Sequence, residues 1–386
     1  MKKILYLIVI AISVFGLSVS SALAQNNTTP SSANPKTDYY KAKVTKILNT
    51  KADTDPNDPA YDQNIQNVTV TFLDGAEKGN SKDVPYYPKV SGNDQDLKVG
   101  ETVYVTKVDD GQNVYYTVSE RYRFDSMIWL AILFFILVIV IGKYKGFGSL
   151  LGLGFSFLVI MKYIVPQILA GKNPLIICLI GAIAIAVVSI YVAHGFNLRT
   201  SLAVISTIAT IAIALGLDYG VIHWLKLFGS GSEDAVYAQF SSAGVINLRG
   251  LLLGGIIIGV LGVLDDITTA QAAVVDELKK ANPKSTFKEL YSGGISVGKE
   301  HIASLINTLV LAYVGASFPL VLLFHDYAQP LTYILNSELV AEEIARALIG
   351  GSALVLAVPL TTAFVAYVLT KWNIVSKGSS THAHHH

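Results

Sequence analysis

The segment Arg249-Gly-Leu-Leu-Leu-Gly-Gly-Ile-Ile-Ile-Gly-Val-Leu-Gly-Val-Leu-Asp-Asp266 is an apolar run with spaced glycines that ends in two adjacent carboxylates. Its uncharged part, residues 250–264, has 15 residues, fewer than the roughly 20 needed to cross a hydrocarbon core. It predicts a short membrane helix that stops at its aspartates. Glycines spaced i,i+4 let another helix approach closely in lipid, and the pairs expected to serve helix packing are Gly250 with Gly254 and Gly255 with Gly259.

Asp265 and Asp266 form the first candidate site. Successive side chains on a helix point about 100° apart, so the two carboxylates cannot face the same partner. One interpretation places them at the inner water interface. The other places at least one inside a helix bundle, where an ionisable group is costly and indicates function, here the binding of a cation or proton. Negative charge at a helix C-terminus opposes the macrodipole, which is a modest argument for the second interpretation.

The composition of the chain indicates its class. Hydrophobic residues make up 52% of the 386 residues and charged residues only 15%. Because the apolar residues form blocks of membrane-spanning length, we predict an α-helical polytopic membrane protein over residues 126–370. The formal net charge of +1 argues against nucleic-acid binding. Seven spans are predicted, at residues 126–141, 146–165, 174–193, 199–217, 250–266, 302–324 and 346–370.

The two ends of the chain carry targeting and tail signals. Lys2 and Lys3 precede an apolar stretch, and Ala22-Leu-Ala24 offers a cleavage site, so residues 1–24 are typical of a signal peptide. An uncleaved anchor helix is the alternative, and either one exports the residues that come after it. Polar residues 25–36 are a predicted linker. Residues 371–386 are expected to be a cytoplasmic tail whose histidines indicate a tag rather than a metal site.

Residues 37–123 predict a small extracytoplasmic all-β domain. Alternating apolar and polar residues mark strands at 40–48, 68–72, 101–108 and 114–118. The sequence Asp109-Asp-Gly111 joins the last two strands as a hairpin. Short strands of this kind favour a closed OB- or SH3-like barrel. Between Lys36 and Asp125 the sequence has 12 basic and 15 acidic residues, which favour a structural or protein-binding role, with an envelope protein as partner, over nucleic acid.

The loops predict the orientation of the spans. Cationic side chains gather after the first, third, fifth and seventh spans, so these loops are expected in the cytoplasm. This orientation places the β domain outside and the C-terminus inside, in agreement with the signal peptide.

Both long connections between spans are predicted to be ordered. The outer connection, 218–248, contains an amphipathic segment at 221–228 that suits the membrane interface. The inner connection, 267–299, begins with a predicted helix that has Ile267, Ala270, Val274 and Leu278 on one face and ends at Asn282-Pro283. Thr286 and Glu289 then form a capping box for a second short helix that stops at Gly293-Gly294. Glu342 and Glu343 precede Arg346 at ion-pair spacing.

A second group of polar residues opens the sixth predicted span. Lys299, Glu300 and His301 are expected on the same side of the membrane as the two aspartates, so an Asp–Lys or Asp–His pair is one interpretation. A buried carboxylate beside a histidine can carry protons near neutral pH. A plain headgroup anchor is the alternative. Asn307 lies about two turns deeper, and its alternative role is a hydrogen bond between helices.

The short, glycine-rich spans and the ionisable residues between them favour a secondary transporter or efflux permease. Its ion, proton or substrate site is expected at Asp265, Asp266, Lys299, Glu300, His301 and Asn307. The sequence contains no phosphate-binding loop for ATP and no metalloprotease or hydrolase motif. We therefore expect no enzyme activity, cofactor or catalytic metal. The alternative is a non-transporting envelope scaffold that binds partners. The lipid bilayer is the expected environment, and the glycine pairs serve packing within one chain or within a homo-oligomer.

Five motifs succeed one another between residues 248 and 346, namely 248–256, 259–266, 292–301, 307–317 and 336–346. In this order they resemble the YibE/F family of bacterial membrane proteins, over about residues 120 to 370. One departure is Lys299-Glu300, where the family is expected to have Arg-Asp. The resemblance implies a multi-span membrane protein with an exported N-terminal domain, and it does not imply a substrate.

Overall fold

The computed structural model describes residues 36–372, apart from 56–57, 89–95, 243 and 327–329. The chain divides into a β unit within residues 27–137 and a helical unit from residue 138 onward. The predicted signal peptide (1–24), all but the last residue of the predicted linker (25–36) and the C-terminal histidines lie outside the described residues.

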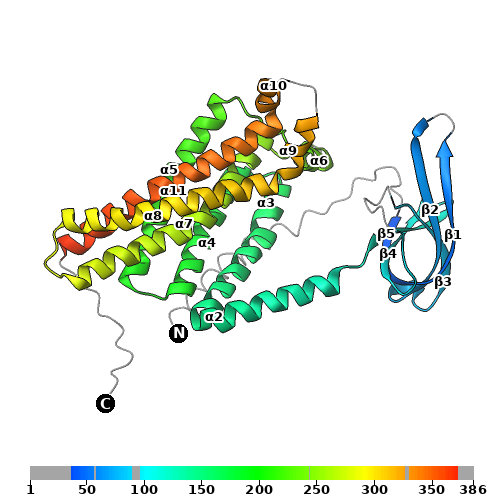
Figure 1. The fold of residues 1–386 in the computed structure, drawn as a ribbon, viewed down its shortest axis with the longest axis horizontal. Helices are drawn as coiled ribbons and strands as arrows, with labels where there is room; N and C mark the ends of the chain where they lie inside the picture. Colours follow the sequence, from blue (N-terminus) through cyan, green and yellow to red (C-terminus); the bar gives the residue numbers. More distant parts are fainter. Residues whose placement is uncertain (1–35, 56–57, 89–95, 243, 327–329, 373–386) are drawn as a thin grey trace, which may run out of the picture. The chain divides into compact units, whose positions relative to one another are not determined.

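The β unit is a closed five-stranded barrel with the strand order β1-β2-β3-β5-β4 (Figure 1). Every neighbouring pair is antiparallel except β3 with β5. This confirms the predicted barrel and its four strands; the third strand, which carries Pro85, was not predicted because its alternation is weak. The strands are β1 (Lys36–Asp55), β2 (Asp58–Phe72), β3 (Ser81–Tyr86), β4 (Thr102–Asp109) and β5 (Val114–Arg121).

Alternating residues of the strands fill the barrel. Ala42 and Val44 of β1 are fully buried, as are Val68 and Val70 of β2 and Val103 of β4. This period of two is what a strand with one face on a core requires. The barrel therefore has an apolar core of its own.

Glu77 is the best-connected charged group of the barrel. Its carboxylate accepts a hydrogen bond of 2.8 Å from the Tyr116 hydroxyl, and the ammonium groups of Lys107 and Lys82 lie 3.4 and 3.6 Å away. The hydrogen bond from Tyr116, with further bonds from Asn80 and Lys107, lowers the pKa of Glu77 to about 2. Glu77 lies in the short helix η1 (Gly75–Glu77) and so ties this connection to β3, β4 and β5.

Five helical segments among the described residues are long and apolar enough to cross a membrane, namely Phe124–Leu169, α4, α5, α7 and α11. The first contains the predicted spans 126–141 and 146–165, which Lys143 separates with a φ of 49°. The bounds are α2 (Phe124–Val159), η2 (Ile160–Ile164), α3 (Val165–Leu169), α4 (Pro174–His194), α5 (Leu198–Trp224), α6 (Glu233–Ser241), α7 (Leu248–Ala281), α8 (Phe287–Ala316), α9 (Phe318–Asp326), α10 (Leu331–Asn336) and α11 (Glu338–Lys371).

The predicted span 302–324 is not one of these five segments. It is divided between α8 and α9 at Ser317. Pro319 supplies the physical reason, since proline lacks the N–H that would continue the helix and restricts the residue before it. In α11, by contrast, the helix continues through Pro359.

The predicted helix end at Asp265 and Asp266 is wrong. Helix α7 continues for 15 more residues, to Ala281. Beyond the aspartates, Ile267, Gln271 and Val275 stay buried at helical spacing, so the packed face of the helix does not end where its hydropathy falls. The aspartates are therefore within a helix, and the macrodipole argument does not apply to them.

Two other predicted boundaries are also wrong. Gly293-Gly294 does not stop α8, although the capping box of Thr286 and Glu289 is confirmed. A Cβ atom at Gly294 would lie 2.6 Å from Cγ2 of Thr362, so this glycine permits close packing against α11. Residues 221–224, predicted as part of an interfacial helix, are the last turn of α5.

Carboxylates of α11 hold the connection between α5 and α7. Glu338 accepts a 2.6 Å hydrogen bond from the backbone N–H of Phe228, and Glu342 accepts one of 3.0 Å from Gly231. Glu343 forms the predicted ion pair with Arg346, at 3.1 Å. Glu342 is therefore used for the connection and not for Arg346.

Helix α7 is central to the helical unit, where it contacts α4, α5, α8 and α11. Figure 1 shows α5, α7, α8 and α11 running alongside one another. Their shared core is aliphatic and includes Ile256, Ile257 and Leu264 of α7. Buried polar residues of the same helices interrupt this core.

Candidate functional site

The structure places the two aspartates of α7 in different surroundings. Asp265 is partly buried, and its carboxylate accepts a 3.2 Å hydrogen bond from the Ser189 hydroxyl of α4. Asp266 is exposed at the surface of the helical unit. Of this pair, only Asp265 belongs to the interior.

The polar residues at the centre of α8 do not join the aspartates. Lys299, Glu300 and Asn307 are exposed. His301 is partly buried, and its Nδ1 atom is buried without a hydrogen-bond partner. Among the described residues, no ion pair or hydrogen bond links this group to α7. The predicted Asp–Lys and Asp–His pairs are therefore not formed.

The glycine pairs of α7 have unequal surroundings. A Cβ atom at Gly254 would lie 2.6 Å from the sulfur of Cys178, and one at Gly250 would lie 3.2 Å from Pro174. At Gly255 nothing lies within 4 Å, and at Gly259 only the Tyr313 hydroxyl does. The first pair packs against α4, while Gly255 faces open space.

A row of buried polar side chains crosses the interior between α5, α7 and α11; we call Thr207, Thr268, Gln271, Thr361 and Thr362 the polar seam. All five are 0% exposed. The hydroxyls of Thr207 and Thr268 are 2.6 Å apart. The Gln271 amide donates to Thr362 at 2.8 Å and to the Gly294 carbonyl at 2.7 Å. Through Thr268 and Gln271, which are one turn apart on α7, the seam therefore connects four helices.

Two oxygen atoms of the polar seam are buried without a hydrogen-bond partner. They are Oε1 of Gln271 and the hydroxyl of Thr361. Most buried polar atoms in proteins are hydrogen-bonded, so an exception requires an explanation such as a water or an ion. The seam has oxygen atoms available to a ligand that donates hydrogen bonds or carries positive charge.

Asp218 of α5 is the most unusual buried group. Its side chain is 0% exposed, and neither carboxylate oxygen has a hydrogen-bond partner. It lies 11 residues after Thr207, about three turns, so the two lie on one face of α5. An isolated charge in such a place costs far more than a hydrogen bond returns, and the surrounding helices supply none of the partners that a buried carboxylate requires.

Neither Asp218 nor the polar seam was predicted from the sequence. The hydropathy falls after Leu217, and for this reason Asp218 was expected in a connection. A signal was available in the helical spacing of Ala203, Thr207, Ala214 and Asp218, all of which are buried. Small and polar residues at this spacing indicate a packed helix face even where the mean hydropathy is low.

Metal-binding side chains form no cluster among the described residues. Within the described part of the chain, no group of three or more histidine, cysteine, aspartate or glutamate side chains is placed to hold a metal ion.

Comparison with known protein families identifies the helical unit. The family model described as YibE/F-like protein matches residues 130–371, which covers all five apolar segments in whole or in large part. No curated protein and no solved structure matches the chain. The polar seam, Asp218 and Asp265 all lie within the matched residues, and the chain belongs to the YibE/F family.

Proposed function

We propose that the helical unit is a secondary transporter that moves a small cation, in the first instance a proton, past Asp218 and Asp265. The observation that carries the proposal is the Asp218 carboxyl group, which is wholly buried without a hydrogen-bond partner. Ionisable residues inside membrane spans face bundle interiors and mark ion pathways.

The atoms along the proposed path favour a cation over an anion. Asp218, Asp265, Gln271 and Thr361 present oxygen atoms, which are the ligands that hard cations prefer. No lysine or arginine is among them. An anion on this path would therefore be repelled by the carboxylates of Asp218 and Asp265, and no positive side chain would offset that repulsion.

The path has a length suited to a membrane interior. Helices α5 and α7 are antiparallel, since Thr207 contacts Thr268 while Arg249, near the start of α7, donates to the Leu227 carbonyl just after α5. Asp218 therefore lies about 16 Å from the level of Thr268, at about 1.5 Å per residue. This is roughly half of a hydrocarbon core of about 30 Å.

The proposal keeps the orientation predicted from the loops. The cationic residues after the first, third, fifth and seventh predicted spans favour cytoplasmic placement. The β unit would then be extracytoplasmic and the C-terminus cytoplasmic. The polar seam would lie toward the inner side and Asp218 toward the outer side of the membrane.

Flux measurements on the full chain in proteoliposomes test the proposal. An internal pH dye reports proton entry under an imposed pH gradient, and sodium or potassium gradients test the other small cations. We expect Asp218→Asn to lower the flux about tenfold or more, because the amide can neither release a proton nor bind a cation by charge. Asp265→Asn should lower it as well.

Asp266→Asn is the matched control, since Asp266 neighbours Asp265 in the helix but is exposed. Its flux should equal that of the wild type. Equal flux in Asp218→Asn, Asp265→Asn and wild type would contradict the proposal. The absence of any cation flux, with partners captured through residues 37–123, would support the envelope scaffold instead.

A further inference from the structure

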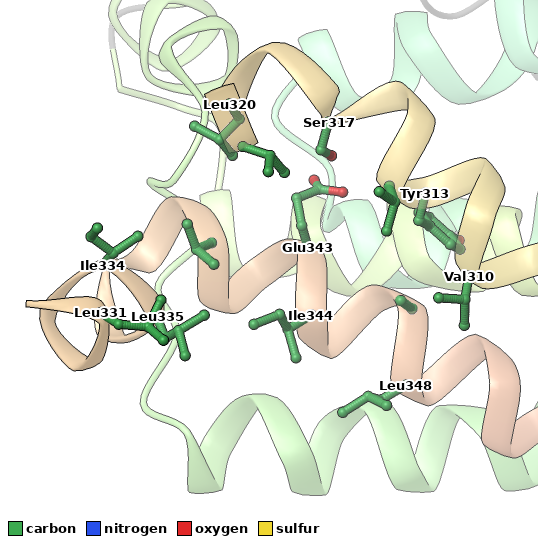
Figure 2. Close-up of a pocket in the computed structure, with 14 residues that line it drawn as sticks. Val310, Tyr313, Ser317, Leu320, Leu331, Ile334, Leu335, Glu343, Ile344 and Leu348 are labelled. Atoms are coloured by element: carbon green, nitrogen blue, oxygen red, sulfur yellow. The ribbon is translucent and has the colours of Figure 1, made fainter. Parts of the chain in front are cut away.

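A cavity of the helical unit lies apart from the polar seam, among α8, α9, α10 and the first turns of α11. Its volume is about 660 Å³, within the range of about 300–1,000 Å³ found for small-molecule sites. Figure 2 shows side chains from these helices converging on it. Most of the lining is aliphatic and includes Val310, Leu320, Leu331, Ile334, Ile344 and Leu348.

Three polar side chains break this apolar lining, and they are Tyr313, Ser317 and Glu343. Figure 2 shows the Glu343 carboxylate and the Ser317 hydroxyl turned toward each other. Arg346 contacts Glu343 at 3.1 Å but does not line the cavity. The cavity therefore presents the Glu343 carboxylate and the Ser317 hydroxyl in a largely apolar wall, and no cationic side chain of the described residues lines it.

We infer that this cavity binds an amphiphile with a single hydrocarbon chain and a cationic amine headgroup. The aliphatic wall suits the chain, because it offers apolar contacts and no polar group that the chain would leave unpaired. The Glu343 carboxylate accepts a charge-assisted hydrogen bond from an ammonium group, and the Ser317 hydroxyl supplies a further oxygen acceptor. A fatty acid of the same length would place a second carboxylate against Glu343 and is selected against.

This inference is independent of the proposed ion path. None of the residues that line the cavity belongs to the polar seam, and neither Asp218 nor Asp265 lines it. Binding here can be measured without any assay of transport, so the failure of one proposal leaves the other standing.

Photolabelling of the full chain in lipid nanodiscs tests the inference. The probe is dodecylamine with a diazirine in its chain, and the matched probes are the corresponding alcohol and carboxylic acid. Mass spectrometry should find the amine attached within residues 310–321 and 338–348. Labelling by the alcohol should be about tenfold weaker, because its hydroxyl can donate to the carboxylate but carries no positive charge. Labelling by the acid should be weaker still, because its carboxylate is repelled by Glu343.

Four variants separate the contribution of the headgroup from that of the hydrocarbon chain. Glu343→Gln should reduce amine labelling to the level of the alcohol and leave the alcohol unchanged. Arg346→Gln also breaks the ion pair but keeps the carboxylate, so amine labelling should persist. Ala347→Phe should fill part of the cavity and reduce labelling by every probe, whereas Leu356→Phe, at an exposed position of the same helix, should have no effect.

Several results would overturn the inference. Equal labelling by all three probes would show that the wall takes up any chain, as a lipid-filled crevice does. Amine labelling that survives both Glu343→Gln and Ala347→Phe would place the probe elsewhere. Crosslinks from residues 310–321 to a second copy of the chain would identify the cavity as an interface between copies.

Discussion

A buried carboxyl group without a hydrogen-bond partner lowers the stability of the protein that contains it. Asp218 is in this situation, whereas Glu77 of the barrel accepts hydrogen bonds and lies beside two lysines. Both groups are carboxylates in sheltered positions, and the difference lies in their partners. The partners of Glu77 stabilise the barrel, whereas Asp218 has no such partners and is the proposed site of the cation.

Replacing Asp218 with valine should stabilise the helical unit and abolish cation flux. An apolar side chain removes the unsatisfied polar group, and we expect a gain of about 1–3 kcal/mol in the free energy of unfolding. Thermal unfolding in detergent measures the gain. Asp266→Val, at an exposed position, should change stability by less than about 0.5 kcal/mol. A loss of stability in Asp218→Val would mean that the carboxylate has a structural role.

Glu77 should make the barrel less stable in acid. Its pKa of about 2 in the folded chain lies below the ordinary value of 4.5, so the unfolded chain binds a proton first as the pH falls. The stabilisation is complete above about pH 4.5 and is lost as the pH falls toward 2. Hydrogen exchange of the β2–β5 amides, with intrinsic rates accounted for at each pH, measures this loss.

In Glu77→Gln the acid dependence should flatten, and stability near neutral pH should fall by about 1–3 kcal/mol. Glu120→Gln is the control, because its ion pair with Arg123 is exposed and contributes little. Identical acid profiles for wild type and Glu77→Gln would contradict the assigned role.

At the scale of the elements, four of the five strands, the capping box and the helix end at Asn282 could be predicted because each depends on local spacing. The ends of α5 and α8, and the continuity of α7 past Asp266, could not. In each case the helix continues because residues such as Gln271 and Gly294 pack against other helices, and this tertiary packing outweighs local stop signals. Hydropathy alone therefore gave spans that were too short, and it also placed Asp218 outside α5.

Gly294→Ala should destabilise the helical unit even though alanine favours helix by about 1 kcal/mol over glycine. The added methyl group would meet Thr362 at 2.6 Å and Val275 at 3.0 Å, and such overpacking costs about 1–3 kcal/mol. Thermal unfolding checks the sign. Gly262→Ala in α7, with nothing within 4 Å, should be neutral or stabilising. If Gly294→Ala, like Gly262→Ala, unfolded at a higher temperature than the wild type, α8 would not be packed against α11 as described.

At the scale of the whole molecule, the chain has two units with separate cores. The barrel core and the helical core are distinct clusters with no residue in common, and the family match begins at residue 130, after the barrel. The family membership therefore describes the helical unit. The role of the barrel has to be inferred from the barrel's own residues.

Deletion of residues 37–123 should leave the stability of the helical unit unchanged, because each core is complete within its unit. Calorimetry of the full chain should show two unfolding transitions, and the deletion variant should retain one of them at the same temperature. One cooperative transition that is lost on deletion would contradict the division into units.

The continuity of α7 has a mechanical consequence. Its 34 residues make a rod about 51 Å long, much longer than a hydrocarbon core of about 30 Å. Tilting a rod of this length by about 10° about its midpoint displaces its two tips by roughly 4 Å in opposite directions. One helix can thus act as a lever that narrows the bundle at one membrane surface while widening it at the other.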